Sequence, residues 1–591
     1  MKREYSIAGM SILLALLPIG SVVYMRGLCY PTHSSSIVCM GGVILFAGLY
    51  AACFVRTDRF RFALPDLFAG IVAIVAAGCY LKYPGLLSLG SLCLPVLYVS
   101  IRRTGKIYPF LLLYGAAITL VLLSLYGYLQ YFRLLPSHSS YFPVTGPYHN
   151  PAVYAGVMTI LLSVLMPYLG SVAFRRRQRK GVVRGIIAAV LLAVPVLLLT
   201  EARAAWVALG VSVAYTFFCA YRHMCASFFR KYRRAILCAA PVILLSGGLV
   251  CYQLKPHSAD GRLLIWKVSL RMIKEKPLTG FGINGFPTNY IFYQARYLAT
   301  EGTEYERYLA GDTHLAFNEP VRIMVEYGLG GILFYLLFVG WVLTFPAKRN
   351  VVSHTARTVL LTMLVWGLFA YPFRVFPVMV FSTIALACLA NQCKPLRVFH
   401  CSFSRAFAAF LFLGSALLGC LGASTMQAYY RLQALARQPA ADVRELDTLR
   451  PLMEGEPAYG YICCLLPDRQ KQDRLLKERL DAYIHMLPSP AAFVWKGDVH
   501  RRLKEYEEAE AAYKKASEMV PALQAARGRL TFLYHDLGRE EEALRLAEEL
   551  LTEKVKVYGF DTHALRLKLK KTFEGKLNNC FTKKSNAYEK K

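Results

Sequence analysis

The sequence is poor in acidic residues and lacks cysteine pairs with metal-binding spacing. Its 591 residues include 37 Asp and Glu against 69 Lys and Arg, a formal net charge of +32. The 16 cysteines form no CxxC pair, and most lie within apolar runs. We interpret them as small buried hydrophobic residues, and we predict no metal site. The adjacent Cys463 and Cys464 do not by themselves predict a disulfide.

Apolar residues, by contrast, are abundant, at 56% of the chain, with a mean hydropathy of +0.37. They come in runs of about 17–25 residues, long enough to cross roughly 30 Å of hydrocarbon as helices. We therefore predict an all-α, polytopic transmembrane bundle. The first run follows Met1-Lys2-Arg3 without a clean cleavage site, so we expect a retained span. The thirteen predicted spans lie at about 6–25, 35–55, 64–81, 84–101, 108–131, 152–173, 183–200, 204–221, 236–252, 328–345, 358–373, 376–392 and 406–426.

The basic charge is distributed unequally between alternate loops. One set of loops holds 25 Lys and Arg residues, whereas the opposite short loops hold only Arg26, Lys82, Arg133, Arg203 and Arg374. The positive-inside rule makes the first set cytoplasmic, so the charge is a topological signal and predicts no nucleic-acid partner. We expect a bacterial inner-membrane protein with a cytoplasmic N-terminus, an external loop over 253–327 and a periplasmic C-terminal region.

The chain divides into a membrane domain, helical repeats and a tail. We predict a transmembrane domain over 1–426, with the long loop 253–327 as its catalytic part. Residues 427–557 are predicted to form tetratricopeptide-like repeats, an α-solenoid, because Gly497, Ala509, Tyr513, Ala516 and Pro521 fall on consensus positions. A concave surface for a protein partner is one reading of these repeats, and simple stabilisation of the outer domain is the other. Residues 558–591 are expected to be a basic tail.

Four features outside the membrane are candidates for chemistry. Arg203 lies at the outer end of the eighth predicted span, in "LLTEARAAWVALG". Arg262 lies at the start of the helical stretch "GRLLIWKVSLRMIKEKP", whose apolar positions are Leu263, Trp266, Leu270 and Ile273. Alone, these arginines read as an interfacial anchor and a solvated surface residue. The turn "KPLTGFGINGF" offers backbone amides to an anion, or is simply a turn. The stretch "DTHLAFNEPVRIMVEYGLGG" places polar and charged side chains just before a predicted span. A polar helix cap is the alternative interpretation.

The order and spacing of these four features resemble the O-antigen ligase and polymerase family. The resemblance covers about 108–345, is strongest over 200–335, and includes "HNPAVYAG" at 149–156, which is similar to members with tetratricopeptide repeats. It implies a glycan donor carried on undecaprenyl diphosphate, a hydroxyl acceptor such as lipid A-core, and no cofactor or metal. Membrane lipid and a protein bound by the repeats are the other expected partners.

The resemblance also implies roles for individual residues. Arg203 and Arg262 match the family's two arginines and are expected to bind the diphosphate, because guanidinium is permanently charged and bidentate. Lys267 and Arg271 lie further along the same helix and are expected to assist. Family ligases carry a His before the Asn of the second half of the loop, but Phe317 stands there. His314, Glu319 and Asp312 are therefore the candidates, in that order, for the general base.

Three functions remain open from the sequence. The first is a ligase that joins a glycan to lipid A-core, and the second uses the same donor as an O-antigen polymerase or a protein O-oligosaccharyltransferase. The third is a flippase or other transporter of lipid-linked sugar. A transporter is expected to show paired broken helices and charges at mid-bilayer, whereas the charges here lie at the outer rim and in one loop. This pattern favours an enzyme.

Overall fold

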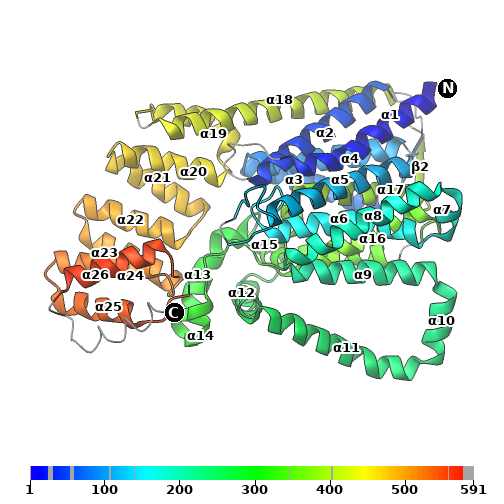
Figure 1. The fold of residues 1–591 in the computed structure, drawn as a ribbon. Helices are drawn as coiled ribbons and strands as arrows, with labels where there is room; N and C mark the ends of the chain where they lie inside the picture. The colour runs from blue at the N-terminus through cyan, green and yellow to red at the C-terminus, as the bar shows by residue number, and fades with distance from the viewer. Residues whose placement is uncertain are drawn as a thin grey trace.

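The computed structural model is predominantly helical (Figure 1). It describes residues 2–574 and Lys576, apart from gaps at 24–30, 54–58, 105–107 and 401–403 and at positions 140, 345, 439, 557 and 575. The membrane region contains α1 (Lys2–Leu16), η1 (Leu17–Val22), α2 (Pro31–Cys53), α3 (Leu64–Lys82), α4 (Leu86–Thr104), α5 (Pro109–Tyr131), α6 (Pro151–Gly170), α7 (Val172–Arg177), α8 (Lys180–Leu199), α9 (Arg203–Ala220), α10 (Arg222–Lys231), α11 (Arg233–Leu254), α15 (Glu319–Thr344), α16 (Val351–Gly367), η2 (Pro372–Arg374), α17 (Phe376–Gln392) and α18 (Ser404–Arg437).

Eight of the described helices are long and apolar enough to cross a membrane, namely α3, α4, α5, α6, α8, α9, α15 and α18. Shorter apolar helical stretches, Ile7–Val22, Ile37–Leu49 and Phe376–Gln392, coincide with three further predicted spans. The predicted span 358–373 falls largely on α16, whose 17 residues are short for a span. The predicted span 236–252 falls on α11, many of whose side chains lie outside the described residues. The polytopic helical fold is confirmed, with eight helices of the length and composition of a span among the described residues.

The two sets of loops defined by their charge gather at opposite ends of the bundle. At one end, β1 (Arg59–Phe62) pairs antiparallel with β2 (Arg397–His400), which joins two loops predicted to be cytoplasmic. The N-terminus, α7, β2 and α10 all lie at this end in Figure 1, whereas α13, α14 and the last helices of the chain lie at the other. At the far end, the backbone amide of Gly455 donates to the carbonyl of Pro84 at 2.8 Å. The alternation predicted from charge is thus matched by the spatial grouping of the loops.

The loop over 253–327 folds into three helices, α12 (Pro256–Glu275), α13 (Gly285–Thr300) and α14 (Glu304–Leu309). The predicted helical stretch is confirmed as α12, but its predicted apolar face is partly wrong. Leu264, Val268 and Met272 form the buried stripe, whereas Leu263 and Leu270 are 55% and 54% exposed. The stripe is displaced because α12 packs against both α13 and α15, and these neighbours select the face that is covered.

The C-terminal helices, α19–α26, pack in consecutive pairs at the end of the molecule that carries the 253–327 loop (Figure 1). They are α19 (Arg444–Met453), α20 (Pro457–Arg469), α21 (Asp473–Met486), α22 (Pro490–Arg502), α23 (Tyr506–Met519), α24 (Gln524–Asp536), α25 (Glu540–Thr552) and α26 (Phe560–Thr572). A Cβ at Gly497 would lie 2.4 Å from the Tyr513 ring, so the two consensus positions pack directly together. The helix α18 continues through the predicted boundary at 426 to Arg437, and α19 begins at Arg444. The end of the basic tail, 577–591, lies outside the described residues.

Candidate functional site

Two turns at the loop end of the bundle bring α9 close to α12. Between α8 and α9 the chain reverses through Glu201, whose φ of 52° is left-handed, and Arg203 then begins α9. The Arg203 guanidinium donates to the carbonyl of Lys255, one residue before α12, at 3.3 Å. The Lys255 ammonium forms an ion pair with the carboxylate of Glu201. These two contacts fix the start of α12 beside the start of α9.

Arg262 projects from the second turn of α12 towards the same region. Its Nη1 donates to the carbonyl of Phe369 at 3.0 Å, and its guanidinium carbon lies 5.3 Å from the ring centroid of Phe317. Burial and then the positive charge of Arg203 lower the pKa of Arg262, while Tyr371 opposes this shift. The structure therefore brings the two predicted arginines within electrostatic range of each other. Two neighbouring cations at one end of the bundle favour an anionic ligand.

Lys267 and Arg271 lie elsewhere. They are about 140° and 180° around the helix from Arg262, because an α-helix turns by roughly 100° per residue. The Lys267 ammonium contacts Glu306 at 2.9 Å, and Arg271 forms an ion pair with Glu301. Both cations also lie near the ring of Tyr297. The structure therefore groups these two residues with α13 and α14 and apart from the Arg203 and Arg262 pair.

The segment 310–318 joins α14 to α15 without regular secondary structure and carries two of the candidate bases. His314 Nε2 lies 3.6 Å from Asp312 Oδ1. Burial lowers the pKa of His314, an effect that Arg374 reinforces and Asp312 opposes, and burial raises the pKa of Asp312. The indole of Trp266 on α12 donates to the carbonyl of Ala316 at 3.0 Å. His314 is thus half-buried and favoured in its neutral form, the form that accepts a proton.

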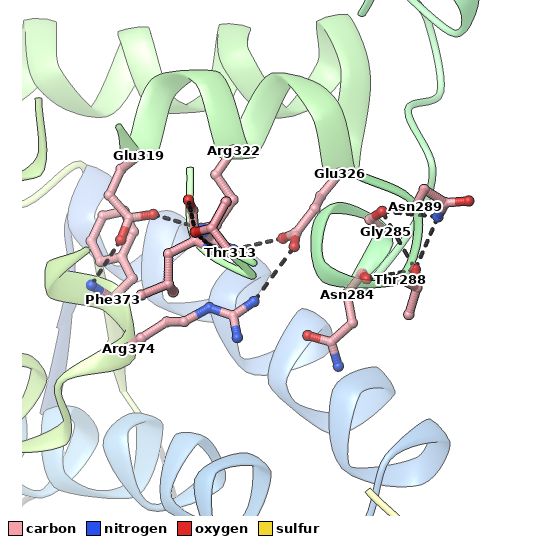
Figure 2. A network of polar contacts seen from close by, with 11 residues as sticks. Asn284, Gly285, Thr288, Asn289, Thr313, Glu319, Arg322, Glu326, Phe373 and Arg374 are labelled. Carbon is pink, nitrogen blue, oxygen red and sulfur yellow. Dashed lines mark hydrogen bonds and ion pairs between the residues drawn. The ribbon is translucent and has the colours of Figure 1, made fainter. Parts of the chain in front are cut away.

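Glu319, the remaining candidate base, belongs to a buried ion-pair network on the first two turns of α15 (Figure 2). Its Oε2 accepts from Arg322 Nε at 2.7 Å, and its Oε1 accepts from the backbone amide of Phe373 at 3.1 Å. Arg322 also contacts Glu326 at 2.6 Å, and Arg374 lies 3.7 Å from Glu326. Glu319 is only 1% exposed. Buried carboxylates require such pairing, and both oxygens of Glu319 are already engaged.

The loop over 368–375, between α16 and α17, connects these groups. The carbonyl of Leu368 accepts from Asn318 Nδ2 at 3.1 Å, while the next carbonyl in the chain accepts from Arg262. Tyr371 packs edge-on against Phe317, and its hydroxyl accepts from Asn150 Nδ2 at 3.1 Å. Asn150 also caps α6, which explains the place of the "HNPAVYAG" motif. The arginine pair, the 310–318 segment and the α15 network thus share one loop as a common support.

The Gly-rich turn "LTGFGINGF" is structural, and the expectation that its amides are free to bind an anion is wrong for three of them. The amides of Gly280, Phe281 and Gly282 donate to the carbonyls of Lys276, Val325 and Glu326. The turn is seated against a kink in α15 at Gly328, where φ is 60° and ψ is −152°. A Cβ on Gly328 would lie 2.2 Å from the carbonyl oxygen of Leu278. Glycine is therefore required there to let the turn approach the helix.

Two arginines of this site were not predicted from the sequence. Arg322 has a detectable signal, because Glu319 and Glu326 lie three residues before it and four residues after it on one helix. Arg374 has no comparable signal, since its contact with Glu326 crosses 48 positions of the chain. The part of the chain that the structure describes contains no group of three or more His, Cys, Asp or Glu residues suited to hold a metal ion.

The site is therefore a cationic cluster at one end of a helical membrane bundle, with a partly exposed His–Asp pair on the same support. A family comparison agrees with this description: residues 187–336 match the model of the O-antigen ligase family. The matched stretch contains Arg203, Arg262, His314 and Glu319 and ends before the 368–375 loop. A comparison with curated proteins finds no match. The chain is a multi-pass membrane protein in which residues 187–336 are similar to the O-antigen ligase family.

Proposed function

We propose that the protein transfers a glycan from undecaprenyl diphosphate to an acceptor hydroxyl, in the manner of an O-antigen ligase, on the periplasmic face of the inner membrane. The observation that carries this proposal is the electrostatic proximity of Arg203 and Arg262 at the end of the bundle where the 253–327 loop folds. A diphosphate held between two guanidinium groups has its charge balanced near the membrane surface, where a polyprenyl carrier presents it.

The reaction requires one bond to form and one to break. The acceptor oxygen attacks the anomeric carbon of the donor glycan, and the bond from that carbon to the diphosphate oxygen breaks. The bonding electrons leave with the diphosphate, whose new negative charge Arg203 and Arg262 stabilise. The proton of the acceptor hydroxyl passes to a general base. The resident groups thus supply charge stabilisation, and no metal or cofactor enters this proposed scheme.

His314 is the base that the geometry supports best. Its pKa is lowered by burial, so it is neutral at physiological pH and ready to accept a proton. Asp312 lies beside it and is placed to stabilise the imidazolium that forms. Glu319 is less suitable, because its two oxygens already accept from Arg322 and from the amide of Phe373. His314 therefore remains the first candidate for the general base, and Glu319 becomes a weaker candidate.

The experiment is a transfer assay with the purified full-length protein and a glycan on undecaprenyl diphosphate. Arg203→Ala and Arg262→Ala are each expected to lower the transfer rate by about 100-fold. Wild-type rates in both variants would contradict the proposed donor site. Orientation is tested separately by reporters fused after Tyr252 and at the C-terminus, and a cytosolic reporter at either point would place the site on the wrong side of the membrane.

The acceptor distinguishes the ligase from the two functions that share its donor. Deletion of the gene in its native host, followed by glycan profiling, separates them. Polymer left on the lipid carrier with bare lipid A-core indicates the ligase that we propose. Caps of a single repeat unit would indicate a polymerase, and unglycosylated proteins would indicate an O-oligosaccharyltransferase.

A further inference from the structure

We propose that the C-terminal helices position the candidate base, so that they form a working part of the site as well as a surface for partners. This inference rests on the proposed function, in which His314 accepts the acceptor proton. The segment 310–318 that carries His314 has no helix or strand of its own. Its position therefore depends on groups that hold it from outside, and some of these groups in turn contact the C-terminal helices.

Gln294 on α13 is the central contact. It is 1% exposed, and its Nε2 donates both to the carbonyl of Gly311 at 3.1 Å and to the carbonyl of Met519 at 2.8 Å. Its Oε1 accepts from the hydroxyl of Tyr290 at 3.0 Å, which fixes the direction in which the amide points. Met519 is the last residue of α23, where a helix leaves carbonyls without partners inside the helix. One buried side chain thus links the end of α23 to a residue three positions before His314.

A second contact links the C-terminal region to Leu309, the last residue of α14 and the residue just before this segment. Lys556 follows α25, and its ammonium donates to the carbonyl of Leu309 at 2.7 Å. The Lys556 side chain is largely exposed, so water also reaches this donor. A charged donor to a carbonyl is nevertheless stronger than a neutral one. Lys556 therefore holds the carbonyl of Leu309, and Gln294 holds the carbonyl of Gly311.

Apolar packing makes this interface more than a pair of hydrogen bonds. Ile291 and Ala295 on α13 form one buried cluster with Met519 and Val520 at the end of α23. The ring of Phe292 packs edge-on against Phe493 of α22 at 6.2 Å. At the far end of the segment, Trp266 of α12 holds the carbonyl of Ala316. His314 thus lies between two contacts of its segment. One, at Gly311, depends on the C-terminal helices, and the other, at Ala316, is made by α12.

The arginine pair is anchored mainly elsewhere, although Arg262 also lies over the ring of Phe317 at the far end of the segment. Arg203 contacts the start of α12, and Arg262 contacts the 368–375 loop. Loosening the interface should therefore disturb proton transfer at His314 and leave donor binding largely intact. The two charged groups that act on His314 are Asp312 and Arg374, and the first of these lies on the segment 310–318 itself.

The test uses the full chain with Gln294→Leu and Lys556→Met, and with Lys571→Met as the matched control, since Lys571 is exposed on α26. Hydrogen exchange of peptides over 309–318, measured without substrate, should accelerate by about tenfold in both variants and not in the control. The kcat for transfer should fall by about tenfold, since small displacements of a catalytic group are costly. The KM for the donor should change by less than about twofold. Lys556→Arg, which keeps a donor, should restore both quantities.

Unchanged exchange, or accelerated exchange with an unchanged kcat, would overturn the positioning role. The failure of the proposed function has a different signature, because it appears as full activity in the Arg203→Ala and Arg262→Ala variants. The acid limb of the kcat/KM profile gives one further readout. It should move to higher pH in Gln294→Leu and Lys556→Met as His314 becomes more hydrated, and a stationary limb would contradict the inference.

Discussion

The guanidinium of Arg262 lies over the ring of Phe317, and this contact places an aromatic residue where related ligases are expected to have histidine. Phe317 has a φ of 50°, which is left-handed and uncommon for a bulky residue. Strain of this kind persists only where the surroundings impose it, and here Arg262 and Tyr371 both contact the ring. The backbone position is therefore strongly defined, although its side chain cannot exchange a proton.

This geometry predicts that a histidine at position 317 can replace His314 as the general base. In a His314→Ala background, Phe317→His should recover at least about tenfold of the lost transfer rate, because it places an imidazole beside Arg262. The measurement is the initial rate of glycan transfer at saturating donor. Phe317→Leu in the same background is the control and should recover nothing. Equal rates in the two double variants would show that the imidazole at 317 does not reach the acceptor.

The two arginines should be separable from the cations further along α12. Arg262→Lys is expected to lower kcat/KM by about 100-fold, because lysine loses the bidentate fork that suits a diphosphate. Lys267→Met should change kcat/KM by less than about threefold, since its ammonium is exposed and paired with Glu306. Steady-state kinetics with the lipid-linked donor checks both. A larger loss in Lys267→Met than in Arg262→Lys would return Lys267 to the donor site.

The pH profile should report His314. Burial lowers the pKa of His314 and Arg374 lowers it further, so the base stays neutral to a lower pH than an ordinary imidazole. The acid limb of kcat/KM should therefore lie below the usual pKa of histidine, about 6.5. Arg374→Gln removes a positive charge, favours the imidazolium and should shift this limb to higher pH, whereas Arg374→Lys should not. An acid limb at the same pH in Arg374→Gln and in the wild type would show that Arg374 does not act on the pKa of the base.

The kink in α15 should tolerate only glycine. Gly328→Ala places a Cβ against the Leu278 carbonyl in a backbone conformation that is almost confined to glycine, so we expect a loss of more than about 2 kcal/mol in the free energy of unfolding. Gly330→Ala is the matched control, because a Cβ there meets nothing within 4 Å, and it should be neutral or slightly stabilising. Thermal unfolding in detergent compares the two. Equal midpoints would show that α15 adjusts its path without cost.

Much of the fold is predictable from the sequence because the bilayer imposes simple rules. The length of the apolar runs predicts where the helices lie. The alternation of Lys and Arg places two loops on the same side of the membrane, and the structure pairs these loops through β1 and β2. The span count was less predictable, since α16 follows an apolar run and is only 17 residues long. The buried face of α12 also required tertiary contacts, because α13 and α15 determine which leucines are covered.

The candidate site was predictable where its residues lie in one motif and not where the chain returns from a distance. Arg203 and Arg262 are predicted from the family resemblance, whose motifs contain them, and the structure brings them together. Glu319 was expected to be a candidate base, but a hydrogen bond from Phe373, 54 positions away, occupies one of its oxygens. Arg374 and the 368–375 loop were missed for the same reason. Long-range pairing of this kind leaves no local pattern in a single sequence.

The continuity of α18 has a mechanical consequence. A helix of 34 residues is about 50 Å long, whereas the hydrocarbon layer is only about 30 Å thick. The same rigid rod that is anchored in the bilayer therefore rises roughly 20 Å beyond it and sets the height at which α19–α26 stand. Only residues 438–443 join α18 to α19, so the direction in which α18 leaves the bilayer limits where the C-terminal helices can stand.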